Sequence, residues 1–330
     1  MYLAAAPWSA PSWLKVYGTL TPYNNSNTLL HTDAAYSTYS QYLGKAVQSF
    51  RDLGLAVDYV SVQNEPLFGT SSEYPGMFLS AEDSFKLNVL LRTELDRLGL
   101  ATQLLSYDHN WDHPEYPLDQ LTSAGGDGSK VFGGVAWHCY GGDMSFAQDA
   151  VHSAYPHTLQ LLTECTGAYP AACDVTQGMT GFGYNHEWDM QNLLLGGAGH
   201  WSSGALKWIL VLDEECGPTL PTVTFNNGRP LVSITSSNQV YFNQDYWSIA
   251  HMSKFLIPMV SQRVQSDILV ANSETHILTQ SFVDIASGQV VCIVMNLDHD
   301  HDAAIELNDK VLGKSMQDSL PPFSTKIYMW

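Results

Sequence analysis

The sequence predicts an α/β protein in which a parallel sheet covered by helices is followed by a smaller all-β domain. Short apolar runs alternate with helix-like stretches over most of the chain, as they do when helices connect the strands of a parallel sheet. From about residue 254 the segments are strand-like, separated by turns and free of helical period, which is typical of a β-sandwich. We therefore expect two domains, at residues 1–253 and 254–330.

Six apolar segments are the expected strands of the parallel sheet, because strands buried on both faces are apolar nearly throughout. They cover residues 1–8, 57–64, 102–108, 131–140, 159–164 and 204–213. The helices expected between them cover residues 33–53, 82–99, 143–155 and 187–200. The second of these helices follows the sequence Ser80-Ala-Glu-Asp83, which indicates an N-terminal cap.

The strands expected in the all-β domain are short and lie between turns. They cover residues 276–284, 288–298, 303–309 and 324–330. A closed eight-stranded barrel needs two strand–helix units more than the six that precede this domain. The chain begins directly on a strand-like segment, so we expect a barrel that lacks its first two units.

The charge of the chain limits its partners. With 33 acidic and 14 basic residues the formal net charge is −19, which argues against nucleic acid and anionic membranes as partners. The apolar runs are too short to cross a bilayer, and the first residues have no basic region typical of a signal peptide. Nine Trp and 17 Tyr residues favour an uncharged ligand such as a sugar, whose apolar face stacks on aromatic rings.

The chain has five cysteines, an odd number, so at least one thiol has no partner within the chain. Cys165 and Cys173 are close enough in sequence to form a disulfide, which would indicate an oxidising compartment. Cys292 lies in an apolar run, as expected for an inert core residue.

Two glutamates lie at equivalent places, each at the C-terminal end of an expected strand. Glu65 follows the run SVQN and precedes Pro66, and Glu164 ends the run LQLLT. In a parallel α/β barrel these strand ends form the mouth where active sites lie. Pro66 should bias Glu65 toward an extended conformation. Such a pair of carboxylates is what glycoside hydrolysis requires, although either glutamate alone is compatible with an ordinary solvated strand end.

Several motifs resemble glycoside hydrolase family 30, which includes glucosylceramidases, endo-β-1,6-glucanases and xylanases. They are APWSAPSWLK at the start, SVQNEP, WHCY at residues 137–140, LLTECTG and the ending STKIYMW. The resemblance implies a (β/α)8 TIM barrel with a β-sandwich, and a retaining mechanism without metal or cofactor. By motif, Glu65 is the acid/base and Glu164 the nucleophile.

The resemblance and the strand pattern together suggest further substrate contacts. Asn64 is expected to hydrogen-bond the sugar 2-hydroxyl. Trp8 and Trp208 are expected to line the sugar subsite, and His138 and Tyr140 share one face of a strand. The sequence SYDHNWDH adds Tyr107, Asp108, His109 and Trp111 as candidates in a loop after the strand.

The substrate is expected to be a neutral β-glycan or β-glucoside. Asp213, Glu214 and Glu215 lie in the loop where related xylanases bind a uronic acid, and an acidic loop repels such a group. Arg229 is the nearby residue that could reverse this interpretation. The motifs favour an endo-β-1,6-glucanase; the alternatives are a glucosylceramidase-like enzyme, an endo-β-1,6-galactanase and a non-catalytic carbohydrate-binding fragment. We expect a monomer, truncated at its N-terminus, from a secreted parent.

Overall fold

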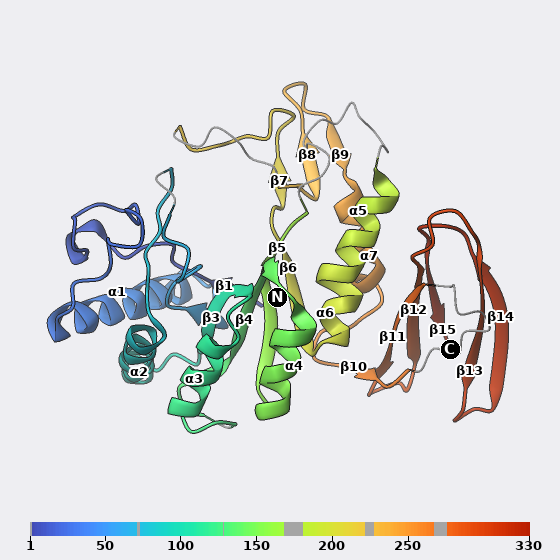
Figure 1. The fold of residues 1–330 in the computed structure, drawn as a ribbon, viewed down its shortest axis with the longest axis horizontal. Coiled ribbons are helices and arrows are strands. Elements are labelled where there is room, and N and C mark those ends of the chain that lie inside the picture. The colour runs from blue at the N-terminus through green and yellow to red at the C-terminus, as the bar shows by residue number, and fades with distance from the viewer. Residues whose placement is uncertain (1, 71–72, 128, 168–180, 222–227, 267–275) are drawn as a thin grey trace. The chain divides into compact units, whose positions relative to one another are not determined.

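The computed structural model describes residues 2–70, 73–127, 129–167, 181–221, 228–266 and 276–330 (Figure 1). The chain divides into two compact units. The first contains residues 1–165, 200–206 and 220–225, and the second contains residues 166–199, 207–219 and 226–330. No helix within the described ranges is both long and apolar enough to span a membrane.

A six-stranded sheet forms the centre of the first unit, and its strands lie in chain order from β1 to β6 (Figure 1). The strands are β1 (Ala4–Ala5), β2 (Tyr59–Ser61), β3 (Gln103–Trp111), β4 (Phe132–Gly142), β5 (Leu159–Cys165) and β6 (Ser202–Lys207). The four pairs from β1 to β5 are parallel. Leu104, Val135 and Leu162 are fully buried, which agrees with strands that are apolar on both faces. This is the sheet predicted for a barrel without its first two strands.

Helices connect the strands of this sheet. They are α1 (Asp33–Asp52), α2 (Ala81–Arg97), α3 (Glu115–Ser123) and α4 (Met144–Ala154), with a short 3₁₀ helix at Ser12–Leu14. Ser80 caps α2 as predicted, because its hydroxyl accepts the amide of Asp83 at 3.1 Å. Helix α3 was not predicted, since it is short and contains Pro117. The proline lies in the first turn, where its missing N–H has no partner to lose.

The second unit contains helices and three small antiparallel or mixed sheets. Its helical elements are α5 (Phe182–Asp189), a π-helical segment (Met190–Leu194), α6 (Leu195–Gly199) and α7 (Gln244–Ser253). Strands β7 (Val211–Leu212), β8 (Val232–Ile234) and β9 (Val240–Phe242) form one sheet. The strand predicted at residues 204–213 is therefore divided between β6 and β7, which belong to different sheets.

The C-terminal strands form two antiparallel sheets, as the sequence predicts. One sheet contains β10 (Ser261–Val264), β11 (Ile277–Asp284), β12 (Val290–Asn296) and β15 (Thr325–Met329), and the other pairs β13 (Ala303–Asp309) with β14 (Lys314–Leu320). Cys292, Val294, Leu320 and Tyr328 form a shared apolar core, and Cys292 is free and buried. Strands β10 and β14 were not predicted, because most of their residues are polar.

Candidate active site

Glu65 lies in a turn after β2, which ends at Ser61. Its amide donates to the carbonyl of Asp108 at 2.9 Å, and its carbonyl accepts the amide of Phe68 at 3.0 Å. These bonds hold Glu65 at φ 47°, in the left-handed region, where a non-glycine residue costs of order 1–3 kcal/mol. The extended conformation predicted from Pro66 is therefore wrong, because the turn and its two hydrogen bonds determine the backbone.

Glu164 lies in β5, and the sheet register pairs it with His138 on β4. The hydroxyl of Tyr140, also on β4, donates to Glu164 Oε1 at 3.0 Å. Burial raises the pKa of Glu164 to about 7; the charge of Glu65 adds to this, and the charge of His138 opposes it. The two glutamates therefore share one electrostatic environment, in which a second negative charge is disfavoured.

His138 lies between two carboxylates and is almost completely buried. Its Nδ1 is 3.2 Å from Glu65 Oε1, and its Nε2 is 3.3 Å from Asp108 Oδ1. Although burial disfavours the charged ring, these hydrogen bonds raise the pKa of His138 to about 10. The imidazolium therefore donates to both carboxylates near neutral pH.

Asp108 is the second hydrogen-bond partner of His138. Its buried carboxylate accepts the hydroxyls of Ser61 and Thr163, the latter at 2.6 Å. Burial acts to raise its pKa, but the hydrogen bonds from His138, Ser61 and Thr163 lower it. Ser61 and Thr163 were not predicted as site residues. The sequence does contain a signal for them, because each is a hydroxyl residue in an apolar strand. Ser61 lies four positions before Glu65, and Thr163 lies next to Glu164.

Strand β3 contains a bulge at Asp108, next to His109. Tyr107 pairs with Ala136 and His109 with Trp137, so Asp108 is the extra residue on this strand. Tyr107 and Asp108 have φ values of 76° and 69°. The loop predicted for this segment is therefore wrong: the strand continues through Trp111, and the bulge changes which side chains face Glu65.

His109 is the second histidine near Glu65, with Nδ1 3.8 Å from Glu65 Oε1. Burial lowers the pKa of His109 to about 4, against the opposing charge of Glu65. A neutral and a cationic imidazole thus flank the same carboxylate.

The other predicted site residues have different surroundings. Asn64 is buried, and its backbone N–H donates to the carbonyl of Pro7 at 2.8 Å. The indole of Trp8 makes an edge contact with Tyr74 at 5.3 Å between ring centroids. Tyr107 packs between Tyr116 and Trp137 in the core. Trp111 is also buried, and Trp208 belongs to the second unit.

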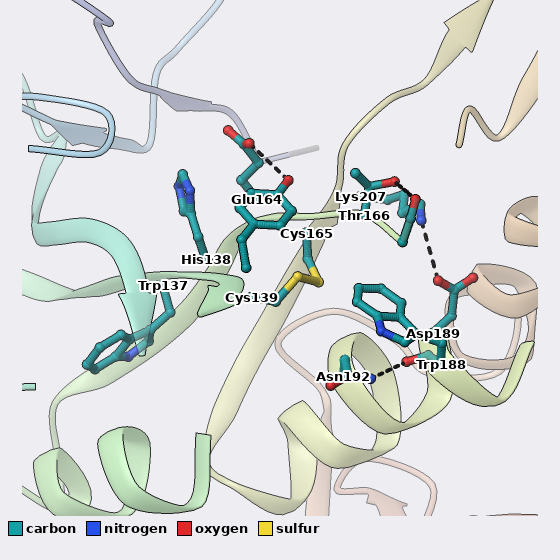
Figure 2. The surroundings of a disulfide bond; sticks show 12 residues. Trp137, His138, Cys139, Glu164, Cys165, Thr166, Trp188, Asp189, Asn192 and Lys207 are labelled. Carbon is teal, nitrogen blue, oxygen red and sulfur yellow. Dashed lines mark hydrogen bonds and ion pairs between the residues drawn. A yellow bond between two sulfur atoms is a disulfide. The ribbon is translucent and has the colours of Figure 1, made fainter. Parts of the chain in front are cut away.

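The disulfide in this region connects Cys139 and Cys165, whose Cα atoms are 5.3 Å apart (Figure 2). The predicted pairing of Cys165 with Cys173 is therefore wrong, and Cys173 lies outside the described residues. Sequence distance suggested the wrong partner, because the register of β4 and β5 places residues 26 positions apart side by side. Each cysteine immediately follows a site residue, His138 or Glu164.

Arg229 lies in a buried ion cluster of the second unit. Its guanidinium contacts Asp189 at 2.8 Å and Asp245 at 3.0 Å, and Lys207 contacts the same two carboxylates. With only 4% of its surface exposed, Arg229 is engaged by carboxylates of the chain and is not available to a uronic acid.

Comparisons with known proteins identify the family of the chain. The model of the glycosyl hydrolase family 30 TIM-barrel domain matches residues 1–256. An endo-1,6-β-D-glucanase, neg1, from Aspergillus fumigatus is 33% identical over 271 residues, which cover 78% of this chain and 51% of the relative. The lysosomal acid glucosylceramidase of Mus musculus is 26% identical over 343 residues, covering 99% of this chain and 62% of the relative.

A solved structure, the endo-β1,6-glucanase BT3312, superposes on all of this chain and on 71% of its own, with a TM-score of 0.81 and 24% identity. This likeness supports the fold. The chain spans about half the length of the glucanases it matches.

Proposed function

The chain belongs to glycosyl hydrolase family 30, and on that premise we propose that it is the catalytic part of a retaining glycoside hydrolase acting on neutral β-linked glucan. The observation that supports this most is the linked pair of glutamates. Glu65 contacts His138, Tyr140 on the same strand as His138 contacts Glu164, and the charge of Glu65 helps to raise the pKa of Glu164. A retaining pair is expected to be ~5–5.5 Å apart, with no water between nucleophile and sugar.

In the proposed reaction Glu164 attacks the anomeric carbon while Glu65 gives its proton to the departing glycosidic oxygen. This forms a glycosyl ester on Glu164 and leaves Glu65 ionised. Glu65 then takes a proton from water, whose oxygen attacks the anomeric carbon and releases Glu164. Asn64, Trp8 and Trp208 are proposed substrate contacts.

The reaction requires a proton on Glu65 and an ionised Glu164. Burial opposes this ionisation, because it raises the pKa of Glu164 to about 7. We infer that bound sugar selects the reactive arrangement. Its glycosidic oxygen accepts a proton from Glu65, and the positive charge that develops on the anomeric carbon stabilises ionised Glu164.

The glucan substrate is preferred because of the relatives and the charge. The fungal relatives are named endo-1,6-β-D-glucanases, and the acidic chain has its Arg229 engaged by Asp189 and Asp245. The glucosylceramidase alternative is supported by the match to the mouse protein over nearly the whole chain.

We also propose that the chain divides into a barrel portion, residues 1–253, and a sandwich, residues 254–330. The Cys139–Cys165 disulfide is consistent with a secreted parent.

Hydrolysis assays test the function directly. The chain is incubated with linear β-1,6-glucan, with glucosylceramide in detergent and with glucuronoxylan, and released sugar is measured. Glu65→Gln and Glu164→Gln should each lower hydrolysis of the preferred substrate by at least about a thousandfold, whereas Glu82→Gln, an exposed glutamate on α2, should not. Binding of glucan without any release of sugar would favour the non-catalytic alternative.

A further inference from the structure

Three side chains at the site carry potential metal-ligand atoms that lie close together. Within the part of the chain that the structure describes, Glu65, His109 and His138 each offer one such atom, and all three atoms lie within 4.8 Å of one another. Glu65 Oε1 is 3.2 Å from His138 Nδ1 and 3.8 Å from His109 Nδ1. Ligands of a tetrahedral Zn²⁺ at ~2.0–2.1 Å are about 3.3 Å apart, so small side-chain shifts suffice.

His109 contributes a buried nitrogen with no hydrogen-bond partner. Its Nδ1 is shielded from solvent, and no described group donates to it or accepts from it within hydrogen-bond distance. An unsatisfied buried polar atom costs about 1–3 kcal/mol, and an ion bound beside Glu65 would remove that cost.

His138 has the second partner that metal-binding histidines usually have. Its Nε2 faces Asp108 Oδ1 at 3.3 Å, while Nδ1 faces the proposed ion position. Such a carboxylate–imidazole arrangement fixes the ring and makes the coordinating nitrogen a better ligand. Ser61 and Thr163 in turn hold Asp108.

We propose that Glu65, His109 and His138 bind a divalent transition-metal ion of the zinc type, and that this ion inhibits the hydrolase by occupying its acid/base carboxylate. Two imidazoles and one carboxylate with an open fourth position suit Zn²⁺, whereas Mg²⁺ and Ca²⁺ prefer all-oxygen sites. The ion must displace the proton that His138 carries. Glu65, Asp108 and Glu164, which attract that proton, attract a doubly charged ion more strongly.

The inhibition rests on the proposed function, but metal binding can be measured without any substrate. Titration calorimetry with Zn²⁺ on the whole chain should show a site that His109→Gln weakens by about 10- to 100-fold, the usual loss when a metal site is perturbed. The matched control is His301→Ala. The side chain of this residue is 80% exposed in the Asp- and His-containing turn after β12 and contacts Asp298. Its variant should bind Zn²⁺ as before.

A second measurement does not depend on a variant's folding. Co²⁺ bound to the unchanged protein should give the strong visible absorption of a four-coordinate site with nitrogen ligands. If the chain hydrolyses glucan, Zn²⁺ should inhibit it, Mg²⁺ should not, and a chelator should restore the rate. Zn²⁺ affinity that His109→Gln leaves unchanged, or a weak six-coordinate Co²⁺ spectrum, would overturn the inference. An inactive chain that still binds Zn²⁺ through His109 would overturn only the proposed hydrolase.

Discussion

Removal of the Tyr140 hydroxyl should weaken Glu164 as a nucleophile. This hydroxyl donates to Glu164 Oε1 at 3.0 Å and lowers the pKa of that carboxyl. In Tyr140→Phe the bond is lost, so the pKa of Glu164 rises further above its already raised value of about 7. A smaller fraction of Glu164 is then ionised at any pH below that value.

The magnitude follows from the type of bond. A hydrogen bond to a charged group contributes about 1.5–3 kcal/mol, and each ~1.4 kcal/mol is a factor of ten in rate. We therefore expect kcat/KM to fall about 10- to 150-fold, and the loss to be larger at pH 5 than at pH 8. The sign follows because only the ionised form attacks.

The assay compares pH–rate profiles of the unchanged chain, Tyr140→Phe and the control Tyr17→Phe on an aryl β-glucoside. Tyr17 is 52% exposed and packs against the ring of Tyr23, outside the described surroundings of the two glutamates. Thermal unfolding is recorded for each variant to confirm that it folds. A loss smaller than threefold across pH 5–8 would refute the role assigned to this hydrogen bond.

Three further predictions concern stability. Asp245→Ala removes one of the two carboxylates that contact the buried Lys207 and Arg229, so urea unfolding should show a loss of about 3–5 kcal/mol. Asp33→Ala, which removes an exposed ion pair with Lys86, should cost far less, and equal effects would contradict the buried cluster. Burial lowers the pKa of His186 to about 4, whereas it is ~6.5 in the unfolded chain. The unfolded state therefore binds more protons between these values, and the free energy of unfolding should fall by up to ~3 kcal/mol as pH falls from about 6.5 to 4. The stability of His186→Gln should fall less over that window, and an identical fall would show that His186 is not the cause. The Cys139–Cys165 disulfide joins residues 26 positions apart in the chain. The double variant Cys139→Ser/Cys165→Ser should therefore lose about 3 kcal/mol of unfolding free energy, measured in denaturant, and unchanged stability would exclude the bridge.

The elements that the sequence predicted well are those set by burial and local chemistry. The runs around Val60, Leu104, Val135 and Leu162 are apolar because both faces of the sheet are covered, so the continuous apolar runs were enough to identify their strands. The cap at Ser80 is similarly local. Glu65 and Glu164 were recognisable because each carboxylate ends an apolar run, although their roles remain proposals.

The features that were not predicted from the sequence depend on strand register and on tertiary contacts. The extra residue at Asp108 follows from how β3 pairs with β4, and the partner of Cys165 follows from how β4 pairs with β5. The left-handed backbone of Glu65 depends on its bond to Asp108, 43 positions away in the chain. No local pattern contains this information, because each case is decided by a segment distant in sequence.

Covalent trapping tests the assignment of the nucleophile most directly. The chain is incubated with a 2-deoxy-2-fluoro-β-glucoside that carries a good leaving group, and peptides are then mapped by mass spectrometry. A fluoroglucosyl ester on the peptide containing Glu164, absent in Glu164→Gln, is the predicted result. A label on a different carboxylate, or glucan hydrolysis that inverts the anomeric centre, would contradict the two-glutamate retaining mechanism.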